Sequence, residues 1–327
     1  MQTNKNSLYN FIKEQASQCK ILVVGDVMLD KYYYGEVKRI SPEAPVPITR
    51  VLREKETLGG AANVAHNLAL LGCQTFLAGF VGEDYHRQSL LEKLSERQID
   101  HEGLICTTAP TTTKLRIMGG HQQMLRLDFE ETSPAAEPFQ KKLLDFIQRK
   151  LAAGLDCLII SDYGKGLCTP ELCQELIKSC QAKNIAIIID PKGSTWHKYM
   201  GADYITPNLK EINEILSEPI PNTDEAVKKA SQYIKKKYKI HNILATRSEC
   251  GISLIASRKV THIPTLAQEV FDVSGAGDTV IAVFALALAG KIKPENGAYL
   301  ANLAASVVVA KLGTYAISKA ELLEKLY

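Results

Sequence analysis

The sequence lacks the features that mark exported, membrane-spanning and broadly nucleic-acid-binding proteins. Its 327 residues carry a formal net charge of only +3, and the basic residues are scattered rather than gathered in one run. The N-terminal segment has no apolar core of a secretory signal. The longest apolar run, residues 280–289, is about half of what a membrane span needs. We therefore predict a cytoplasmic protein whose partners include neither nucleic acid nor membrane.

Cysteine is present, but not in a metal-binding pattern. The eight cysteines include no CxxC pair, and no histidine stands near enough to Cys168, Cys173 and Cys180 to complete a zinc site. Reduced thiols of a cytosolic protein are the preferred interpretation.

Three common enzyme motifs are also missing. No GxxxxGK[ST] loop is present, which excludes a P-loop kinase, and no GxGxxG follows the first expected strand, which counts against a Rossmann dehydrogenase. No GxSxG elbow occurs, so an α/β-hydrolase has no support.

Short apolar runs alternate with amphipathic stretches, and this predicts an α/β fold with a mainly parallel central sheet. Strands are expected at residues 21–24, 75–80, 157–161, 185–190, 204–206 and 242–245. Helices are expected at residues 61–71, 86–97, 170–182, 223–237, 276–289 and 297–311. The segments 31–58 and 111–129 lack helical periodicity, and the second alternates around Gly119-Gly120 as a hairpin does. We predict one domain, residues 1–327, with a small β-lid formed by these two segments.

The strongest chemical signal is Asp272-Val273-Ser274-Gly275-Ala276-Gly277-Asp278, directly before an apolar helix. Glycine permits a tight turn with uncovered N–H groups, and at a helix N-terminus such groups bind anions. We expect the amides of Gly275, Ala276 and Gly277 to stabilise the charge that develops in phosphoryl transfer. Asp278 falls in the first turn, where the helix dipole favours its ionised form, so it can act as a general base. The alternative is a structural turn with a helix-starting aspartate.

Two further elements suit the binding of a polyol. Gly59-Gly60 opens an amphipathic helix, where small residues let a ligand approach the backbone and the Asn63 amide can both donate and accept hydrogen bonds. Asp26 ends the first strand, where α/β sheets place ligand contacts. Taken alone, Asp26 and Asn63 are more often turn or cap residues, so both interpretations stay open.

Three segments in the second half of the chain are candidates for contacts with a nucleotide. In the first segment a strand leads into a helix, and Asn208 and Glu211 can face the same side of the first helical turn. Glu211 either orients Mg²⁺ through water or only caps the helix. Lys192 follows a second strand end and is placed to neutralise phosphate charge. The third segment, residues 246–251, forms a turn between strands that could border the nucleotide. The full candidate set is Asn208, Leu209, Lys210, Glu211, Lys192, Thr246, Arg247, Ser248 and Gly251.

Together these residues resemble the PfkB, or ribokinase-like, carbohydrate kinase family. The Gly59-Gly60 element and residues 272–278 match its two best-known signatures in the expected order, and the resemblance covers about residues 20–323. It implies a ribokinase-like three-layer α/β/α fold with a β-lid, ATP as donor, Mg²⁺ as cofactor and Asp278 as the base. It also implies nucleotide contacts at residues 208–211 and a homodimer built through the β-lids.

Within the family, the resemblance is closest to kinases of D-glycero-β-D-manno-heptose 7-phosphate. The segments that carry it begin at Gly25, Arg39, Gly60, Thr113, Arg126, Ser161 and Lys311, and read GDVMLD, RISPEAPVP, GAANVA, TKLR, RLDFEE, SDY and KLGT. The resemblance implies phosphorylation of the anomeric hydroxyl to the 1,7-bisphosphate, on the route to ADP-heptose for lipopolysaccharide. It also places Asp30 among the sugar contacts.

A sugar that already carries a phosphate needs cationic anchors. The candidates lie in or near the expected hairpin, or after the strand at 157–161, and are Lys114, Arg116, Arg126 and Lys165. The alternative is that these are solvated charges on strand faces.

The chain departs from the family pattern in some places. Heptose members often carry a further nucleotidyltransferase domain, and its HxGH motif is missing, which predicts a stand-alone kinase or the kinase part of a longer protein. Ser274 and Phe271 stand where threonine and tyrosine are usual. The resemblance also implies a monovalent cation such as K⁺ beside this loop, with Asp272 and Ser274 as contributors. Two alternatives stay open, namely another sugar or nucleoside kinase and a sugar- or nucleotide-sensing protein without catalysis.

Overall fold

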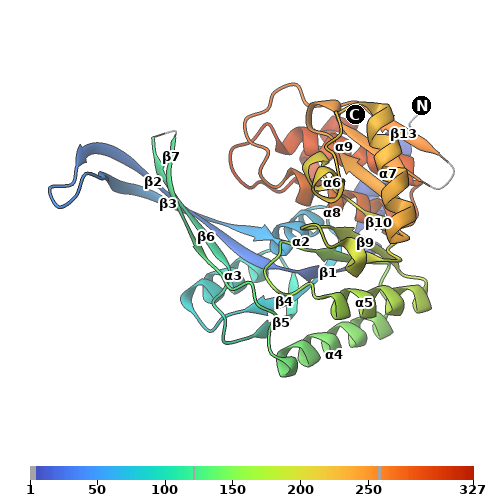
Figure 1. Ribbon diagram of the computed structural model, residues 1–327, viewed down its shortest axis with the longest axis horizontal. Coiled ribbons are helices and arrows are strands. Elements are labelled where there is room, and N and C mark those ends of the chain that lie inside the picture. The colour runs from blue at the N-terminus through green and yellow to red at the C-terminus, as the bar shows by residue number, and fades with distance from the viewer. Residues whose placement is uncertain (1–4, 121, 257–258) are drawn as a thin grey trace.

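The computed structural model describes residues 5–120, 122–256 and 259–327, which form a layered α/β body with a long projecting β arm (Figure 1). In the described residues the central sheet has the strand order β13-β12-β11-β10-β9-β8-β1-β4-β5. Pairing is parallel from β11 to β5 and antiparallel across β11, β12 and β13. The strands are β1 (Lys20–Gly25), β4 (Gln74–Val81), β5 (Asp100–Cys106), β8 (Cys157–Ser161), β9 (Ala186–Asp190), β10 (Tyr204–Ile205), β11 (Asn242–Thr246), β12 (Ile252–Ile255) and β13 (Val260–Ile263).

Helices cover both faces of this sheet, because its strands are apolar on both sides. In β1, Ile21 and Val23 enter one core while Leu22 and Val24 enter the other. The first core is covered by α1 (Lys5–Asn10), α2 (Ala61–Leu70), α3 (Tyr85–Glu96), α8 (Ala276–Ala289), α9 (Pro294–Val308) and α10 (Lys319–Leu326). The second is covered by α4 (Glu137–Ala153), α5 (Pro170–Lys183), α6 (Leu209–Ile215) and α7 (Asp224–Tyr238). The result is the predicted three-layer α/β/α architecture.

A second sheet, which we call the β-lid, contains β2 (Val27–Ile40), β3 (Pro47–Gly60), β6 (Thr113–Gly119) and β7 (Gln122–Phe129) in the order β3-β2-β6-β7. β2 pairs in parallel with β6, and the other pairs are antiparallel. β2 starts directly after β1, so the β-lid rises from the edge of the central sheet where β1 ends. The β2–β3 hairpin extends furthest from the body (Figure 1).

The expected strands and helices are present within a few residues of their predicted bounds. Elements that the sequence analysis did not anticipate include α4, β5 and β13. In α4 the buried side chains Leu143, Phe146, Ile147 and Leu151 recur at helical spacing, so the sequence carries a signal for this helix that the sequence analysis did not use. No helix among the described residues combines the length and the apolar character that a bilayer crossing requires.

Candidate active site

The candidate site lies at the carboxyl ends of the parallel strands. β1 is flanked by β4 on one side and β8 on the other, so the chain order changes direction there. Ligands of open α/β sheets bind at such a point, beyond the strand ends. Asp26 directly follows β1, Asp162 directly follows β8, and Asp190 ends β9. The topology therefore brings three carboxylates from distant parts of the sequence to one edge.

Asp278 lies in the first turn of α8 and is buried. Its Oδ2 accepts a hydrogen bond from Asn63 Nδ2 at 2.7 Å, and its Oδ1 accepts one from the Tyr163 hydroxyl at 2.6 Å. Burial raises the pKa of Asp278 to about 6, although the bonds from Asn63 and Tyr163 act to lower it. The carboxyl therefore remains mostly ionised at pH 7. The dipole argument alone predicts a low pKa, and burial outweighs it.

The turn before α8 differs in one respect from the expectation. Gly275 is the N-cap and has φ of 79°, the left-handed region that favours glycine. Gly277 is exposed and nothing lies within 4 Å of a Cβ built on it, so a ligand can reach this backbone. The Ala276 N–H, however, donates to the Val273 carbonyl at 3.2 Å. The prediction of three free amides is wrong for Ala276, because the tight turn itself consumes that donor.

The Gly59-Gly60 element is shaped by close packing against β2. Gly60 has φ of 54°, and a Cβ there would meet the Asp26 carbonyl oxygen at 2.5 Å. A Cβ on Gly59 would meet Asp30 Oδ2 at 2.6 Å. These glycines bring the start of α2 close to Asp26 and Asp30. Asn63, in the first turn of α2, is thereby carried to Asp278.

Asp26, a predicted sugar contact, organises a loop in the structure. Its carboxylate accepts the N–H groups of Tyr163 at 2.7 Å, Lys165 at 3.0 Å and Leu167 at 3.4 Å. Burial raises the pKa of Asp26, against the lowering effect of these bonds. The structural role that the sequence analysis left open for Asp26 is therefore observed, and its contact with a sugar stays a prediction.

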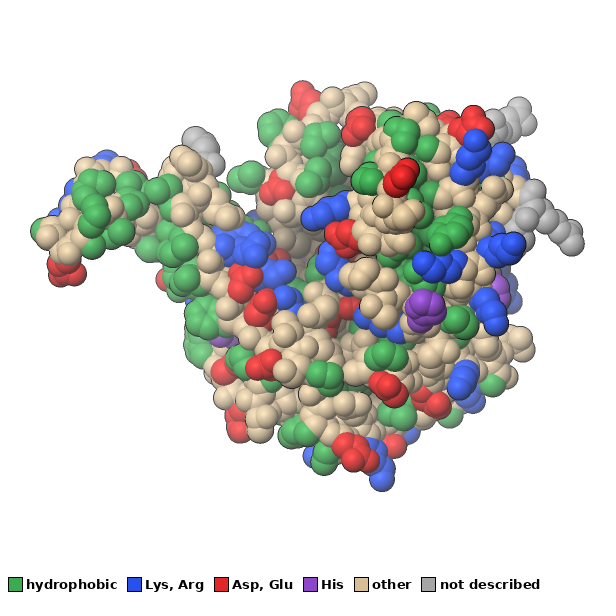
Figure 2. All heavy atoms as spheres, in the orientation of Figure 1, with side chains coloured by type: hydrophobic (Ala, Val, Ile, Leu, Met, Phe, Trp, Pro, Cys, Tyr) green, Lys and Arg blue, Asp and Glu red, His purple; other side chains and the backbone are tan. Residues whose placement is uncertain are grey.

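The four candidate cations come together at the base of the β-lid, and we call them the basic cluster: Lys114, Arg116, Arg126 and Lys165. Three of them are paired with carboxylates, which are Asp30 for Arg116 at 2.7 Å, Asp128 for Arg126 at 2.8 Å and Glu130 for Lys165 at 2.7 Å. Figure 2 shows Lys and Arg side chains beside acidic ones where the β-lid joins the body.

Lys114 differs from the rest of the basic cluster. It is partly buried and forms no ion pair with any carboxylate of the described residues; its ammonium lies 5.9 Å from the centre of the Tyr163 ring. Burial lowers the pKa of Lys114, and the Asp30 carboxylate opposes this effect. A cation in this situation gains more from a bound anion than a paired one does.

A polar cavity of about 200 Å³ is lined in part by Gly277 and by Tyr163, the residue that donates to Asp278. Its lining consists of Asp162, Tyr163, Asp190, Lys192, Thr206, Asn208, Glu211, Thr246 and Gly277. Lys192 Nζ lies 3.2 Å from Glu211 Oε1. Burial, followed by the charges of Glu211 and Asp278, raises the pKa of Asp190 well above its usual range. The cavity thus combines excess carboxylate charge with one lysine and an open backbone.

Asn208 and Glu211 form a capping box at the start of α6. Asn208 Oδ1 accepts the Glu211 N–H at 2.9 Å, and Glu211 Oε2 accepts the Asn208 N–H at 3.0 Å. Glu211 Oε1 remains directed toward Lys192 in the polar cavity. Both interpretations of Glu211 therefore have support, a helix cap through one oxygen and a cavity contact through the other. Leu209 is partly buried and Lys210 is exposed, and neither lines the cavity.

The Arg247 side chain does not line the polar cavity, and its contact with a nucleotide stays a prediction. Its buried guanidinium donates to Asn222, Asp224 and Ser253, which tie the turn after β11 to the start of α7. Gly251 closes the same turn with φ of 78°, where a Cβ would meet the Ile263 carbonyl oxygen at 2.2 Å. Neither Gly251 nor Ser248 lines the cavity, and Thr246 is the member of this group that does.

Replacing Arg247 by methionine is expected to destabilise the fold by about 1–3 kcal/mol, because the buried Ser253 hydroxyl loses a hydrogen-bond donor and the bonds to Asn222 and to the largely exposed Asp224 are lost. The KM for ATP should stay unchanged, since the side chain points away from the cavity. Thermal unfolding and steady-state kinetics measure the two effects. A raised KM for ATP with an unchanged Tm would contradict this assignment.

Asp272 joins two loops beside the start of α8. Its Oδ1 accepts the Ser274 N–H at 2.9 Å, and its Oδ2 accepts the Gly313 N–H at 2.9 Å. Burial acts to raise the pKa of Asp272, but these hydrogen bonds outweigh it and the pKa is lowered. The carboxylate therefore fixes the loop that precedes Gly275.

The structure also brings residues into the site that the sequence analysis did not assign. Tyr163 and Asp190 are the main ones, with Asp162 at the cavity wall and Thr314, whose hydroxyl donates to Asp30 Oδ2 at 3.1 Å. Asp162, Tyr163 and Asp190 could have been predicted from the sequence, because they lie at the carboxyl ends of the expected strands at residues 157–161 and 185–190, and such strand ends converge on one edge of the sheet.

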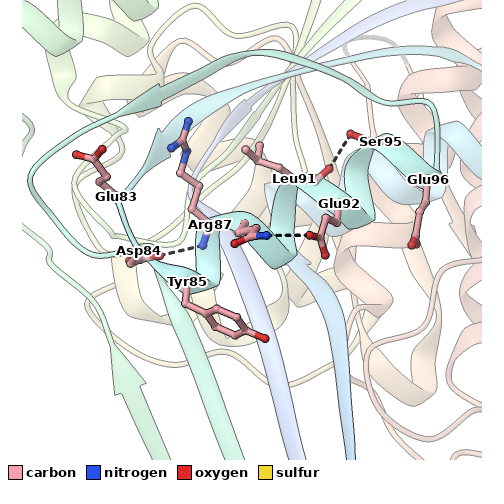
Figure 3. Close-up of a pocket in the computed structure, with 9 residues that line it drawn as sticks. Glu83, Asp84, Tyr85, Arg87, Leu91, Glu92, Ser95 and Glu96 are labelled. Atoms are coloured by element: carbon pink, nitrogen blue, oxygen red, sulfur yellow. Dashed lines mark hydrogen bonds between the residues drawn. The ribbon is translucent and has the colours of Figure 1, made fainter.

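A wider, open depression of about 980 Å³ lies on α3 (Figure 3). Asp84 caps this helix through the Arg87 N–H, and Gln88 donates to Glu92 one turn later. None of the residues that line the depression is buried, so it lacks the desolvated groups that mark a reaction centre.

Comparison with known proteins agrees with this geometry. Residues 18–321 match the pfkB family carbohydrate kinases. The chain is 43% identical over 326 residues to the bifunctional protein HldE of Koribacter versatilis (strain Ellin345), covering 100% of this chain and 67% of that protein. It is 44% identical over 306 residues to the bifunctional protein HldE of Haemophilus influenzae (strain PittEE), covering 93% and 63%. The chain thus spans about two thirds of the length of the curated relatives it matches.

Solved structures agree with the fold. Phosphofructokinase-2 from Escherichia coli in complex with potassium has a TM-score of 0.78 at 19% identity, with 94% of this chain and 98% of that chain covered. Ribokinase from Thermotoga maritima has a TM-score of 0.73 at 22% identity, with 94% and 99% covered. The predicted ribokinase-like fold is therefore confirmed. The chain belongs to the PfkB family and is a sugar kinase.

Proposed function

We propose that the chain transfers the γ-phosphoryl group of ATP to the anomeric hydroxyl of D-glycero-β-D-manno-heptose 7-phosphate. The observation that carries the proposal is the position of Asp278. Its buried carboxylate lies in the first turn of α8, next to Gly277 and bonded to Tyr163, which both line the polar cavity, and the Lys114 ammonium of the basic cluster is near enough to lower its pKa. ATP phosphates suit the cavity side, and a sugar that already carries a phosphate suits the cationic side.

In the proposed reaction Asp278 takes the proton of the attacking hydroxyl. The sugar oxygen forms a bond to the γ-phosphorus, the bond from that phosphorus to the bridging oxygen breaks, and ADP leaves. Lys192 and the exposed amide of Gly277 are placed to stabilise charge on the transferring group. The β-lid covers the sugar side and reduces access of water.

The polar cavity suits a nucleotide-bound Mg²⁺. Asp190 and Glu211 are the residues that would hold it, because the pKa of Asp190, raised by burial and by its acidic neighbours, indicates unrelieved negative charge. Among the described residues no cluster of three or more His, Cys, Asp or Glu side chains is arranged to enclose a metal. Phosphate oxygens and water would complete the coordination, as is usual for this ion. When bound, Mg²⁺ would neutralise phosphate charge.

A substrate panel tests the proposed function. Release of ADP is measured with phosphorylated heptoses, hexoses and pentoses and with the same sugars lacking the phosphate. We expect the highest kcat/KM for heptose 7-phosphate, at least about tenfold above unphosphorylated sugars, since one charged hydrogen bond contributes about 1.5–3 kcal/mol. A preference for an unphosphorylated sugar would instead indicate another sugar kinase of the family, and binding without ADP release would indicate a sensor.

The monovalent cation stays a proposal for residues 272–275. Asp272 and Ser274 lie in the loop that Asp272 ties to Gly313, beside the helix start that carries Asp278. Both Asp272 oxygens already accept an N–H group, so K⁺ would rely on carbonyls of this loop and on the Ser274 hydroxyl. Phosphofructokinase-2, which shares the fold, was solved with potassium.

The proposed partner is a second copy of this chain, joined through the β-lid. The β-lid exposes Ile40, Leu52 and Leu125 on its strands and Val46 in the β2–β3 connection, each at least half exposed, and it projects from the body. Burying these side chains against another β-lid would remove apolar surface from water. The proposed compartment is the cytoplasm, where ATP is available and the eight unpaired cysteines suit reducing conditions.

A further inference from the structure

Tyr163 contacts the proposed base directly. Its hydroxyl donates to Asp278 Oδ1 at 2.6 Å, while Asn63 holds the other oxygen at 2.7 Å. We propose that Tyr163 is a positioning residue that orients Asp278 and keeps it ionised for proton abstraction. This inference rests on the proposed role of Asp278 as the base of the sugar kinase reaction.

The loop that carries Tyr163 is held from two sides. Asp26 accepts the N–H groups of Tyr163, Lys165 and Leu167, and Asp162 accepts the N–H of Gly164 at 2.8 Å. Both aspartates follow strand ends of the central sheet. The phenol is therefore fixed to the rigid part of the fold rather than to a free loop. In this proposal the buried Asp26 carboxylate fixes the position of the Tyr163 loop, and thereby the distance between Tyr163 and Asp278.

Tyr163 can only donate in this pair. Burial, and then the charge of Asp278, raises the pKa of Tyr163 well above its usual range. The phenol accordingly keeps its proton at any pH near neutrality and does not compete with Asp278 for the proton of the sugar. Two donated bonds occupy one lone pair on each carboxylate oxygen and leave the others for the sugar hydroxyl.

The charges around Asp278 make the contribution of Tyr163 necessary. Burial and the Asp30 carboxylate from β2 raise the pKa of Asp278, whereas Asn63 from α2, Tyr163 and the Lys114 ammonium from β6 lower it. Asp190 at the end of β9 is a further acidic neighbour, as its own raised pKa shows. Because these opposing effects leave the pKa of Asp278 at about 6, the loss of one hydrogen-bond donor would raise that pKa toward neutral pH.

The test is the pH dependence of kcat/KM for Tyr163→Phe, which keeps the ring and removes the hydroxyl. We expect the acidic limb to move to higher pH by about one unit, which by itself lowers the rate at pH 7 about twofold. Loss of the orientation of Asp278 should bring the total fall in kcat to about tenfold, with the KM for ATP unchanged. Tyr315→Phe is the matched control, because it removes a phenol that donates to the Glu321 carboxylate at 2.9 Å in the first turn of α10 and has no hydrogen bond to Asp278 or to its partners. The control should leave the acidic limb in place. An acidic limb that stays in place in Tyr163→Phe overturns the inference.

A second measurement does not depend on the substrate. Thermal stability of Tyr163→Phe, Asp278→Asn and the double variant forms a cycle, in which a direct contact gives effects that are not additive. Additive effects overturn the contact. If heptose 7-phosphate proves not to be the substrate, the pH profile is measured with the sugar that the panel selects. Failure of every sugar in the panel refutes the proposed function, while the stability cycle still decides whether Tyr163 and Asp278 are coupled.

Discussion

Replacing Asp278 by asparagine is expected to lower kcat by about 10²–10⁴-fold, the range that a positioned general base contributes. Asparagine has nearly the same size and can still accept a hydrogen bond, but it cannot take the proton of the sugar hydroxyl. ATP binding should be retained, because the polar cavity keeps Lys192, Asn208 and Glu211. Coupled ADP release measures the first effect, and calorimetric titration with ATP measures the second.

Asp156→Asn provides the matched control for this variant. Its carboxylate accepts the Lys20 N–H at 2.8 Å, next to the amino end of β1 and therefore at the opposite edge of the sheet. The control should retain normal kcat. Near-normal turnover of Asp278→Asn would remove Asp278 from the role of base, whatever the substrate is.

Replacing Lys114 by alanine is expected to raise the KM for heptose 7-phosphate by about 10–100-fold. The reason is that Lys114 has no ion-pair partner among the described residues, and burial lowers its pKa, so its ammonium gains most from a bound phosphate. The KM for ATP should change little. Kinetics with each substrate varied in turn separate the two.

Lys150→Ala is the control for Lys114, since Lys150 on α4 is paired with Asp100 at 2.6 Å on the far face of the central sheet. It should leave both KM values unchanged. If Lys114→Ala raises the KM of phosphorylated and unphosphorylated sugars equally, the lysine supports the fold of the site rather than the phosphate. That outcome would indicate that Arg116, Arg126 or Lys165 binds the sugar phosphate instead.

The order of elements was predictable because it follows from local chain properties. Apolar runs such as those of β1 and β8 can be buried on both sides only in a covered parallel sheet. Gly275 and Gly277 next to an apolar run predict an open helix start, which the φ of Gly275 and the space at Gly277 confirm. Helix α4 was missed although its four buried side chains recur at helical spacing, a signal that the sequence itself carries.

Two residues near the site show what sequence position does not predict. Arg247 is adjacent in sequence to Thr246, which lines the polar cavity, yet its side chain points the other way into the contact with α7. Ala276 lies between two glycines of the same turn, and only the turn geometry shows that its N–H is already used. Position along the chain predicts which segment reaches a site, but not which face of the segment does so.

The sequence by itself determined the family, the α/β layering and the identity of Asp278 as the candidate base, because short motifs and apolar periodicity are properties of neighbouring residues. Only the tertiary structure decided which partners the base has. Asn63 comes from α2 and Tyr163 from the loop after β8, and neither lies near Asp278 in the chain. Burial and hydrogen bonding between such distant segments set the pKa of the carboxyl to about 6, a value that the helix dipole alone does not predict.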